Sequence, residues 1–205
     1  MTLAIDKLRE IESRVADALK GREVRPYDIP PEEPASTQAP AETRELARFI
    51  DHTHLKPTGT PNDIRALCAE ARDNGFFSVC VNSCFVPLCA EQLEGSASLV
   101  CSVVGFPLGA MATASKADET RRAVEQGARE IDMVLPVGML LISDYRAVFD
   151  DIRAVVEAAQ GKPVKVILET HFLDAEQKVA ACLISRASGA AFVKTSTGFT
   201  GGGAT

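Results

Sequence analysis

Three ionisable side chains interrupt apolar runs that otherwise have the composition of buried strands. Asp132 lies in Glu-Ile-Asp-Met-Val-Leu, Lys165 in Val-Lys-Val-Ile-Leu-Glu, and Lys194 in Ala-Ala-Phe-Val-Lys-Thr-Ser-Thr. Burying an unpaired charge costs several kcal/mol, so we expect these groups to pair with one another or to lose their charge. If the strands are consecutive and parallel, all three side chains can converge on one interior.

Two lysines that face one aspartate leave an excess positive charge. Desolvation and a like charge both lower the pKa of a lysine, and both therefore favour the free amine. A neutral amine attacks carbonyl groups, and the resulting iminium is an electron sink, while a carboxylate beside it can shuttle protons. The three residues thus predict Schiff-base catalysis that makes or breaks a carbon–carbon bond next to a carbonyl.

Simpler roles remain open for two of these residues. Lys165 follows Pro163 near the start of its strand, where a lysine can reach solvent, and Asp132 can be a structural salt-bridge partner. Lys194 is harder to explain in this way, because Thr-Ser-Thr-Gly follows it where a strand would open into a loop. Backbone N–H groups and hydroxyls at such a place suit a phosphate or sugar oxygen.

Alternating strands and helices are expected to position these residues. The apolar runs predict strands at 49–52, 77–81, 99–104, 130–135, 164–169 and 191–195. Amphipathic stretches between them predict helices at 61–74, 83–93, 113–127, 143–159 and 174–188. This alternation indicates repeated βαβ units. Both a (β/α)8 barrel and an open doubly wound sheet fit, although a barrel needs eight strands and no G-x-G-x-x-G follows a strand here.

The first part of the chain differs from this regular pattern. Apolar residues at helical spacing, followed by Gly21, predict a helix within residues 1–21. Five prolines then lie between residues 22 and 41, which predicts an extended linker. The α/β domain is therefore expected over residues 42–205, with the first helix packed against it or against a partner subunit.

Composition restricts the class of protein further. A formal net charge of −6 without a basic block argues against nucleic-acid binding. No apolar run is long enough for a membrane span and no signal peptide is visible, so a cytoplasmic protein is expected. The six cysteines form no C-x-x-C pair and are expected to be buried, reduced thiols.

Six motifs in order resemble the deoxyribose-phosphate aldolase family, which are class I aldolases on a (β/α)8 TIM barrel. Three are those that contain Asp132, Lys165 and Lys194. The others are Ile-Asp-His-Thr-His-Leu-Lys-Pro at 50–57, Val-Cys-Val-Asn at 79–82 and Val-Val-Gly-Phe-Pro-Leu-Gly at 103–109. The resemblance covers roughly residues 45–205 and is specific because the six motifs occur together.

The resemblance implies reversible cleavage of 2-deoxy-D-ribose 5-phosphate to acetaldehyde and D-glyceraldehyde 3-phosphate, in deoxyribonucleotide catabolism, without a metal or another cofactor. Lys194 matches the Schiff-base lysine, Asp132 the acid/base carboxylate that works through a water, and Lys165 a lysine in that proton network. The residues implied in substrate binding are Asp51, Thr53, Cys80, Thr195, Thr197 and Gly198. Family members are homo-oligomers, so the implied partners are small sugar phosphates, aldehydes and further copies of the chain.

One departure from the family pattern concerns the end of the sequence. The family carries a second essential lysine in a Lys-x-x-Gly-Gly motif on the seventh strand, and most further phosphate contacts on the eighth. The 205 residues contain neither, and about six of the eight βα units. We therefore expect an incomplete barrel, and little or no activity from these 205 residues alone.

Three other functions fit parts of the sequence. His52, His54 and His171 could meet at the ends of two strands and hold a metal for hydrolysis, with Lys165 as a carboxylated bridge. An inactive fragment that serves as an interaction module would explain the departure at the end of the sequence. A sugar-phosphate sensor would need Gly198 and the hydroxyls but not Asp132, whereas the sequence has both.

Overall fold

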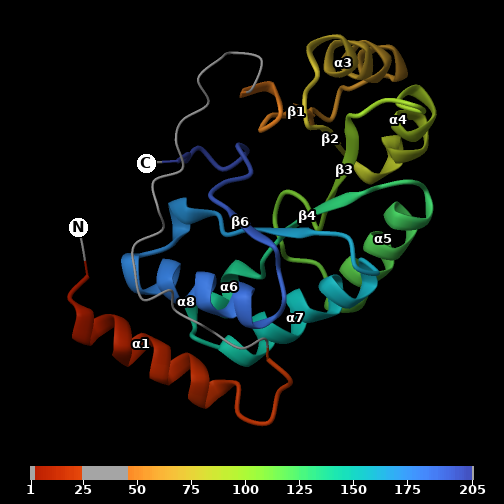
Figure 1. Cartoon of the computed structure of the whole chain (residues 1–205). Coiled ribbons are helices and arrows are strands. Elements are labelled where there is room, and N and C mark those ends of the chain that lie inside the picture. Colours follow the sequence, from red (N-terminus) through yellow and green to blue (C-terminus); the bar gives the residue numbers. More distant parts are fainter. Residues whose placement is uncertain (1–2, 25–45, 205) are drawn as a thin grey trace. The chain divides into compact units, whose positions relative to one another are not determined.

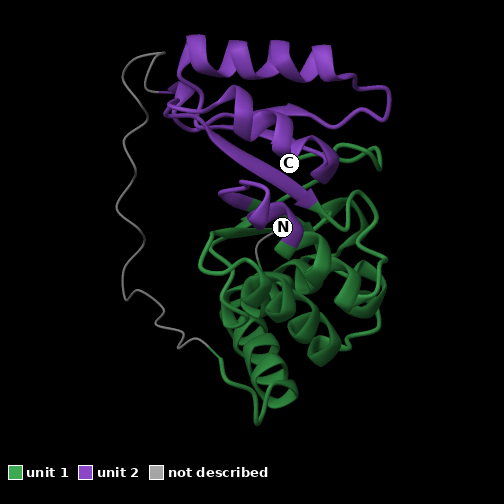
Figure 2. Ribbon diagram, turned by 90° about the vertical axis from the view of Figure 1, so that its right-hand side faces the viewer, with its two compact units in different colours: residues 1–26, 104–121, 131–205 green, residues 27–103, 122–130 purple. Residues whose placement is uncertain are grey.

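The structure of the chain, a computed structural model, describes residues 3–24 and 46–204. These residues form two compact units (Figure 2). The first unit contains residues 3–24, 104–121 and 131–204, and the second contains residues 46–103 and 122–130. The linker predicted at 22–41 lies almost entirely outside the described residues, so the predicted domain limits remain predictions.

Six strands alternate with helices along the described chain (Figure 1). The strands are β1 (Asp51–His54), β2 (Ser78–Val81), β3 (Leu99–Val104), β4 (Glu130–Val134), β5 (Val164–Ile167) and β6 (Phe192–Lys194). The helices after them are α3 (Pro61–Asn74), α4 (Val86–Gln92), α5 (Thr113–Glu125), α6 (Val137–Leu141), α7 (Tyr145–Ala158) and α8 (Ala175–Ala187). All predicted strands and helices have a counterpart among the described residues, whereas the short helix α6 and a 3-10 turn at Thr170–Phe172 were not predicted.

The second unit contains a parallel ladder in chain order. β1 pairs with β2, and β2 pairs with β3. All four residues of β2 are buried, which agrees with the apolar runs expected for a parallel sheet. Within the described part of each unit the strand order shows no reversal, which favours the barrel over the doubly wound sheet.

The first strand begins two residues later than predicted. Phe49 and Ile50 were expected inside it, but their amides donate to the carbonyls of Leu46 and Ala47 at 3.0 and 3.2 Å and form a turn. Phe49 is 78% exposed, so its apolar side chain does not mark a buried strand. The strand instead starts at Asp51, where pairing with β2 begins.

The first unit contains a second parallel ladder, which carries Asp132, Lys165 and Lys194. β5 pairs in parallel with β4 on one side and with β6 on the other. All of β4 is buried, whereas Phe192 and Val193 of β6 are 54% and 47% exposed. Lys194 was expected to interrupt a buried strand. Because the two residues before it are about half exposed, that expectation is wrong for β6.

The N-terminal helix α1 (Ile5–Ala18) packs on the helices behind this ladder (Figure 1). Its apolar face contacts α7 and α8, where Ile11 and Val15 are buried. Arg14 donates to the hydroxyl of Tyr145 at 3.1 Å and pairs with Glu176 at 3.4 Å. The helix is thus part of the first unit, and it fixes α7 relative to α8.

All six cysteines are free thiols. Four are buried as predicted, whereas Cys84 and Cys182 are exposed.

Among the described residues, no helix combines the length and the apolar character that crossing a membrane requires.

Candidate active site

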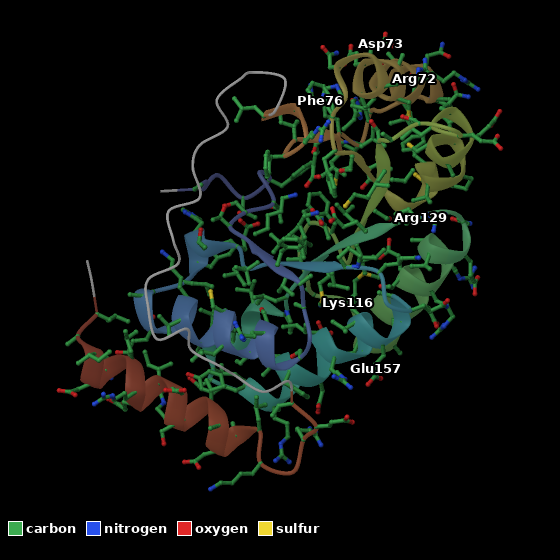
Figure 3. All side chains as sticks on the ribbon, in the orientation of Figure 1. Arg72, Asp73, Phe76, Lys116, Arg129 and Glu157 are labelled. Atoms are coloured by element: carbon green, nitrogen blue, oxygen red, sulfur yellow. The ribbon has the colours of Figure 1, made fainter. Side chains whose placement is uncertain are left out.

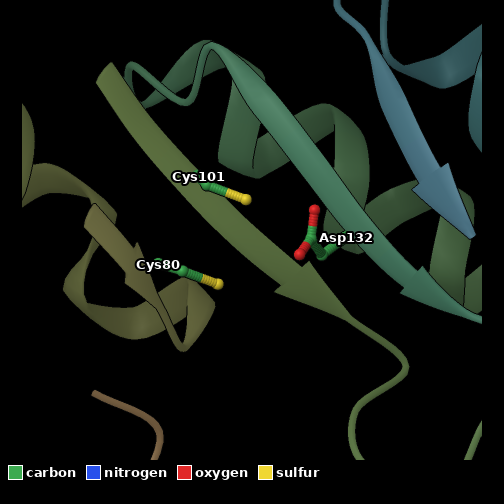
Figure 4. Close-up of side chains that lie close together, drawn as sticks. All are labelled: Cys80, Cys101 and Asp132. Atoms are coloured by element: carbon green, nitrogen blue, oxygen red, sulfur yellow. The ribbon is translucent and has the colours of Figure 1, made fainter. Parts of the chain in front are cut away.

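Asp132 lies in the middle of β4 with its side chain fully buried (Figure 4). The register of the ladder places it directly opposite Lys165 on β5. Lys194 is one strand further, opposite Ile167 of β5. Because side chains alternate between the two faces of a strand, this register brings the three ionisable groups to one face of the ladder.

The two lysines bind different oxygens of the same carboxylate. Lys165 Nζ donates to Asp132 Oδ1 at 3.2 Å, and Lys194 Nζ donates to Asp132 Oδ2 at 2.7 Å. The predicted pairing of the three charges is therefore present in the structure. When all three groups are ionised, the cluster carries one excess positive charge.

The two ammonium groups differ in how far solvent reaches them. The side chain of Lys165 is 14% exposed, and its Nζ also lies 5.9 Å from the centre of the Phe192 ring. The side chain of Lys194 is 32% exposed. Of the two lysines, Lys194 is thus the more accessible to a carbonyl compound from solvent, and Asp132 lies beside its amine as a possible proton acceptor.

The hydroxyl loop after β6 is fixed by a residue at the end of β5. The carboxylate of Glu169, which is 1% exposed, accepts from the Thr197 amide at 3.3 Å and forms a short hydrogen bond with the Thr197 hydroxyl. Thr197 was predicted to bind substrate, but both of its donors are engaged by Glu169. The carbonyl of Thr195 accepts from the Thr170 amide at 2.9 Å, and Gly198 has φ of +79° with open space around it.

The other predicted substrate-binding residues lie in the second unit. Asp51 Oδ1 accepts from the Ser78 hydroxyl at 2.6 Å, and the Thr53 hydroxyl donates to the Asp51 carbonyl at 2.7 Å. Cys80 is buried on β2, opposite Cys101 of β3, as Figure 4 shows for these two thiols. The roles of Asp51, Thr53 and Cys80 in binding remain predictions.

The histidines of the metal hypothesis have other neighbours. His52 Nε2 lies 2.7 Å from Glu70 Oε2, and its ring packs against Phe76 at 5.0 Å between centres. His171 packs against Phe172, and a side chain on Gly202 would clash with it at 2.4 Å. These contacts account for His52 and His171 within their own units, whereas the buried Nδ1 of His54 has no hydrogen-bond partner among the described residues.

Comparison with known proteins agrees with this chemistry. The model of the DeoC/LacD family of aldolases matches residues 46–205. The chain belongs to that family. The deoxyribose-phosphate aldolase of Thermotoga petrophila is 52% identical over 95% of this chain and 76% of its own length. The deoxyribose-phosphate aldolase of Bdellovibrio bacteriovorus is 56% identical over 78% of this chain and 73% of its own.

Solved structures support the fold of this aldolase. A crystal structure from Coccidioides immitis gives a TM-score of 0.80 at 38% identity, over 100% of this chain and 77% of its own. The deoxyribose phosphate aldolase of Aeropyrum pernix, described as having a unique tetrameric structure, gives 0.72 at 29% identity over 97% of this chain and 74% of its own. The predicted class, a set of about six βα units of a TIM barrel, is confirmed, and family membership decides against the hydrolase.

A second lysine–aspartate pair of this aldolase was not predicted. Lys116 on α5 is fully buried, and its Nζ donates to Asp151 Oδ2 of α7 at 2.7 Å and to the Val134 carbonyl of β4 at 3.0 Å. The Thr113 hydroxyl donates to the other oxygen of Asp151 at 2.7 Å. Burial lowers the pKa of Lys116, while the charge and hydrogen bond of Asp151 oppose this shift. Gly105, at φ of +62°, leaves room for the Lys116 stem.

Proposed function

We propose that this aldolase acts on 2-deoxy-D-ribose 5-phosphate through a Schiff base on Lys194, and releases acetaldehyde and D-glyceraldehyde 3-phosphate. The observation that carries the proposal is the contact of Lys194 Nζ with Asp132 Oδ2 at 2.7 Å, with Lys165 on the other oxygen. The names of the Thermotoga petrophila and Bdellovibrio bacteriovorus relatives support the choice of substrate.

The reaction begins when Lys194, having given a proton to Asp132, adds to the aldehyde carbon C1 of the open-chain sugar. Loss of water gives an iminium. The C3 hydroxyl then loses its proton, the C2–C3 bond breaks, and its electron pair moves into an enamine while C3 becomes the carbonyl of glyceraldehyde 3-phosphate. Addition of a proton at C2 and hydrolysis of the iminium release acetaldehyde and the free lysine.

Each residue of the cluster has a distinct part in these steps. Asp132 takes and returns protons at Lys194 and at the reacting carbons, directly or through a water. Lys165 holds the other oxygen of Asp132 and so orients this carboxylate toward Lys194. Thr195 and Gly198 border the loop where the phosphate of the sugar would lie, and Asp51, Thr53 and Cys80 are proposed to line the substrate pocket.

Chemical trapping of the imine tests this function without requiring complete turnover. The purified chain is incubated with acetaldehyde and borohydride, and the modified peptide is identified by mass spectrometry. We expect an N-ethyl group on Lys194. The variant Lys194→Arg should carry none, whereas Lys178→Arg, a change on α8, should react like the native chain. Absence of the adduct from the native chain, or an adduct that survives Lys194→Arg, would refute the proposal.

We also propose that the chain acts as a homo-oligomer in the cytoplasm. The tetrameric Aeropyrum pernix relative supports association. Light scattering on the purified protein should give a mass of at least two chains of 21.9 kDa each, and a monomer at micromolar concentration would contradict this part of the proposal.

A further inference from the structure

Glu169 combines two features that are unfavourable for an ordinary residue. Of the three non-glycine residues with positive φ among the described residues, Ser143 and Gln160 are exposed at helix ends, and only Glu169 is buried. Its φ and ψ of 53° and 61° lie in the left-handed region, which a side chain makes costly. A buried carboxylate adds a desolvation cost. Backbone strain that persists at such a site indicates that the surrounding contacts enforce it.

Thr197 compensates Glu169 with contacts to both of its carboxylate oxygens. Both carboxylate oxygens lie 3.3 Å from the Thr197 amide nitrogen, and Oε2 also accepts from the Thr197 hydroxyl. Backbone hydrogen bonds flank Glu169 on both sides. The Leu168 amide donates to the Lys194 carbonyl, and the Thr170 amide donates to the Thr195 carbonyl, both at 2.9 Å. Glu169 therefore extends the pairing of β5 with β6 past the point where β6 ends.

The clamp reaches further along the loop through Thr197. Its hydroxyl accepts from the Phe199 amide at 3.1 Å, so one threonine holds the turn that follows it. The Phe199 ring then meets the Phe106 ring edge to face, with 5.1 Å between centres and 86° between planes. Phe106 lies in the loop after β3. Glu169 is thus the first link in a chain of contacts that joins three loops of the first unit.

Lys194 depends on these contacts more than its partners do. β6 is only three residues long, and Phe192 and Val193 before Lys194 are about half exposed. Packing on β6 itself therefore holds Lys194 less firmly than the buried β4 holds Asp132. What fixes Lys194 from the other side is its bond to Leu168 and the loop that Glu169 clamps through Thr197.

We propose that Glu169 is a positioning residue for Lys194. By holding Thr197, it fixes the loop after β6 and keeps the Lys194 amine on the Asp132 carboxylate, without touching the reacting atoms itself. The proposal rests on the proposed function, because it assigns the purpose of the clamp to imine formation on Lys194. Misplacing a reacting group slows a reaction even when every catalytic side chain is present.

Four variants separate this role from a general effect on folding or charge. Glu169→Gln keeps the shape but replaces one acceptor oxygen with a donor that faces the donors of Thr197. Thr197→Val keeps the negative charge of Glu169 but removes the hydroxyl, and Thr197→Ser keeps the hydroxyl. Glu157→Gln is the matched control, because it removes an exposed glutamate on α7 (Figure 3).

The first measurement is the rate of imine trapping on Lys194 by acetaldehyde and borohydride, on protein shown to be folded by circular dichroism. Glu169→Gln and Thr197→Val should each slow trapping roughly tenfold or more. Glu157→Gln should trap at the native rate, and Thr197→Ser, which keeps the hydroxyl, should trap faster than Thr197→Val. The double variant Glu169→Gln/Thr197→Val should be no slower than the slower single variant, because both changes remove one contact.

The second measurement is amide hydrogen exchange of Thr197 and Phe199, which does not depend on activity. Exchange should be faster in Glu169→Gln than in the native chain. A native rate of trapping in Glu169→Gln would overturn the proposal, and so would a slow Glu169→Gln beside a native Thr197→Val, which would indicate an effect of charge alone. If the native chain gives no adduct, the proposed function has failed. In that case, unchanged amide exchange in Glu169→Gln would also overturn the clamp on Thr197, whereas faster exchange would support the clamp alone.

Discussion

Two lysine–aspartate pairs of the first unit have the same N–O distance and different surroundings. Lys116 Nζ lies 2.7 Å from Asp151, and Lys194 Nζ lies 2.7 Å from Asp132. Lys116 is fully buried and Asp151 is 3% exposed, whereas the side chain of Lys194 is 32% exposed. Figure 3 labels Lys116, the lysine of the buried pair.

The two pairs differ in the number of cations per carboxylate and in how far the lysine is exposed to solvent. The pair at Lys116 holds one cation and one anion, and a backbone carbonyl and the Thr113 hydroxyl add further hydrogen bonds. The cluster at Asp132 holds two cations on one carboxylate, and one of them is open to solvent. A short distance between a lysine and an aspartate therefore does not by itself mark a catalytic lysine. Our proposal for Lys194 rests on the second cation at Asp132 and on the greater exposure of the Lys194 side chain.

The largest effect is expected at the reactive amine itself. Lys194→Met removes the nucleophile, so the trapped imine should disappear completely. The free energy of unfolding should change by less than about 1 kcal/mol, since a partly exposed ion pair contributes little. Peptide mapping and urea unfolding measure the two quantities. If Lys194→Met failed to fold and the adduct persisted, Lys194 would be a structural lysine and our assignment of the two pairs would be wrong.

Asp132 is the next most sensitive position. Asp132→Asn keeps the shape of the side chain but removes the base, so exchange of the acetaldehyde methyl protons in D2O should fall by roughly 10²–10⁴-fold. Proton NMR follows this exchange. The matched change Asp151→Asn, at the closed pair, is expected to reduce stability instead. Native exchange in Asp132→Asn would show that another group moves the proton.

The closed pair should respond in stability and not in chemistry. Lys116→Met leaves Asp151 buried without a cation, which should lower the free energy of unfolding by about 3–5 kcal/mol. The double variant Lys116→Met/Asp151→Leu removes both charges and should recover most of this loss. Urea unfolding compares the two variants. A double variant no more stable than the single one would mean that the pair itself supplies the stability.

The pH dependence of the closed pair should be the smallest effect. Burial lowers the pKa of Lys116 below its usual value of 10.5, so the folded chain releases this proton at lower pH than the unfolded chain. Between the lowered pKa and 10.5 the unfolded state binds more protons, and stability therefore rises with pH. The free energy of unfolding of the native chain, minus that of Lys116→Met/Asp151→Leu, should increase over this range. A decrease would contradict the direction of the shift.

Much of the fold follows from local signals in the sequence. The predicted helix at 61–74 matches α3 residue for residue, because Thr60 and Asp63 form a capping box and Gly75 ends the helix at φ of +67°. The predicted start of β1 is wrong because Phe49 and Ile50 are apolar but form a turn. An apolar dipeptide alone does not distinguish a strand from a turn beside one.

The candidate site was predictable where a charge interrupts an apolar strand, as at Asp132, Lys165 and Lys194. Lys116 carries no such signal, since it lies in the polar run Ser-Lys-Ala-Asp-Glu-Thr and its partner Asp151 is 35 residues away. The sequence shows Glu169 at the end of its strand, but neither its left-handed backbone nor its clamp on Thr197 can be read from local pattern. Both depend on how distant segments meet.

The docking of α1 also has a consequence for the way the chain is made. Arg14 and Glu176 touch although 162 residues separate them in the sequence. At about 5–20 residues per second, α1 leaves the ribosome roughly 10–30 s before α8 exists to cover its apolar face. The packing of α1 is thus a late step when the chain folds during synthesis, because its partner helix is made long after it.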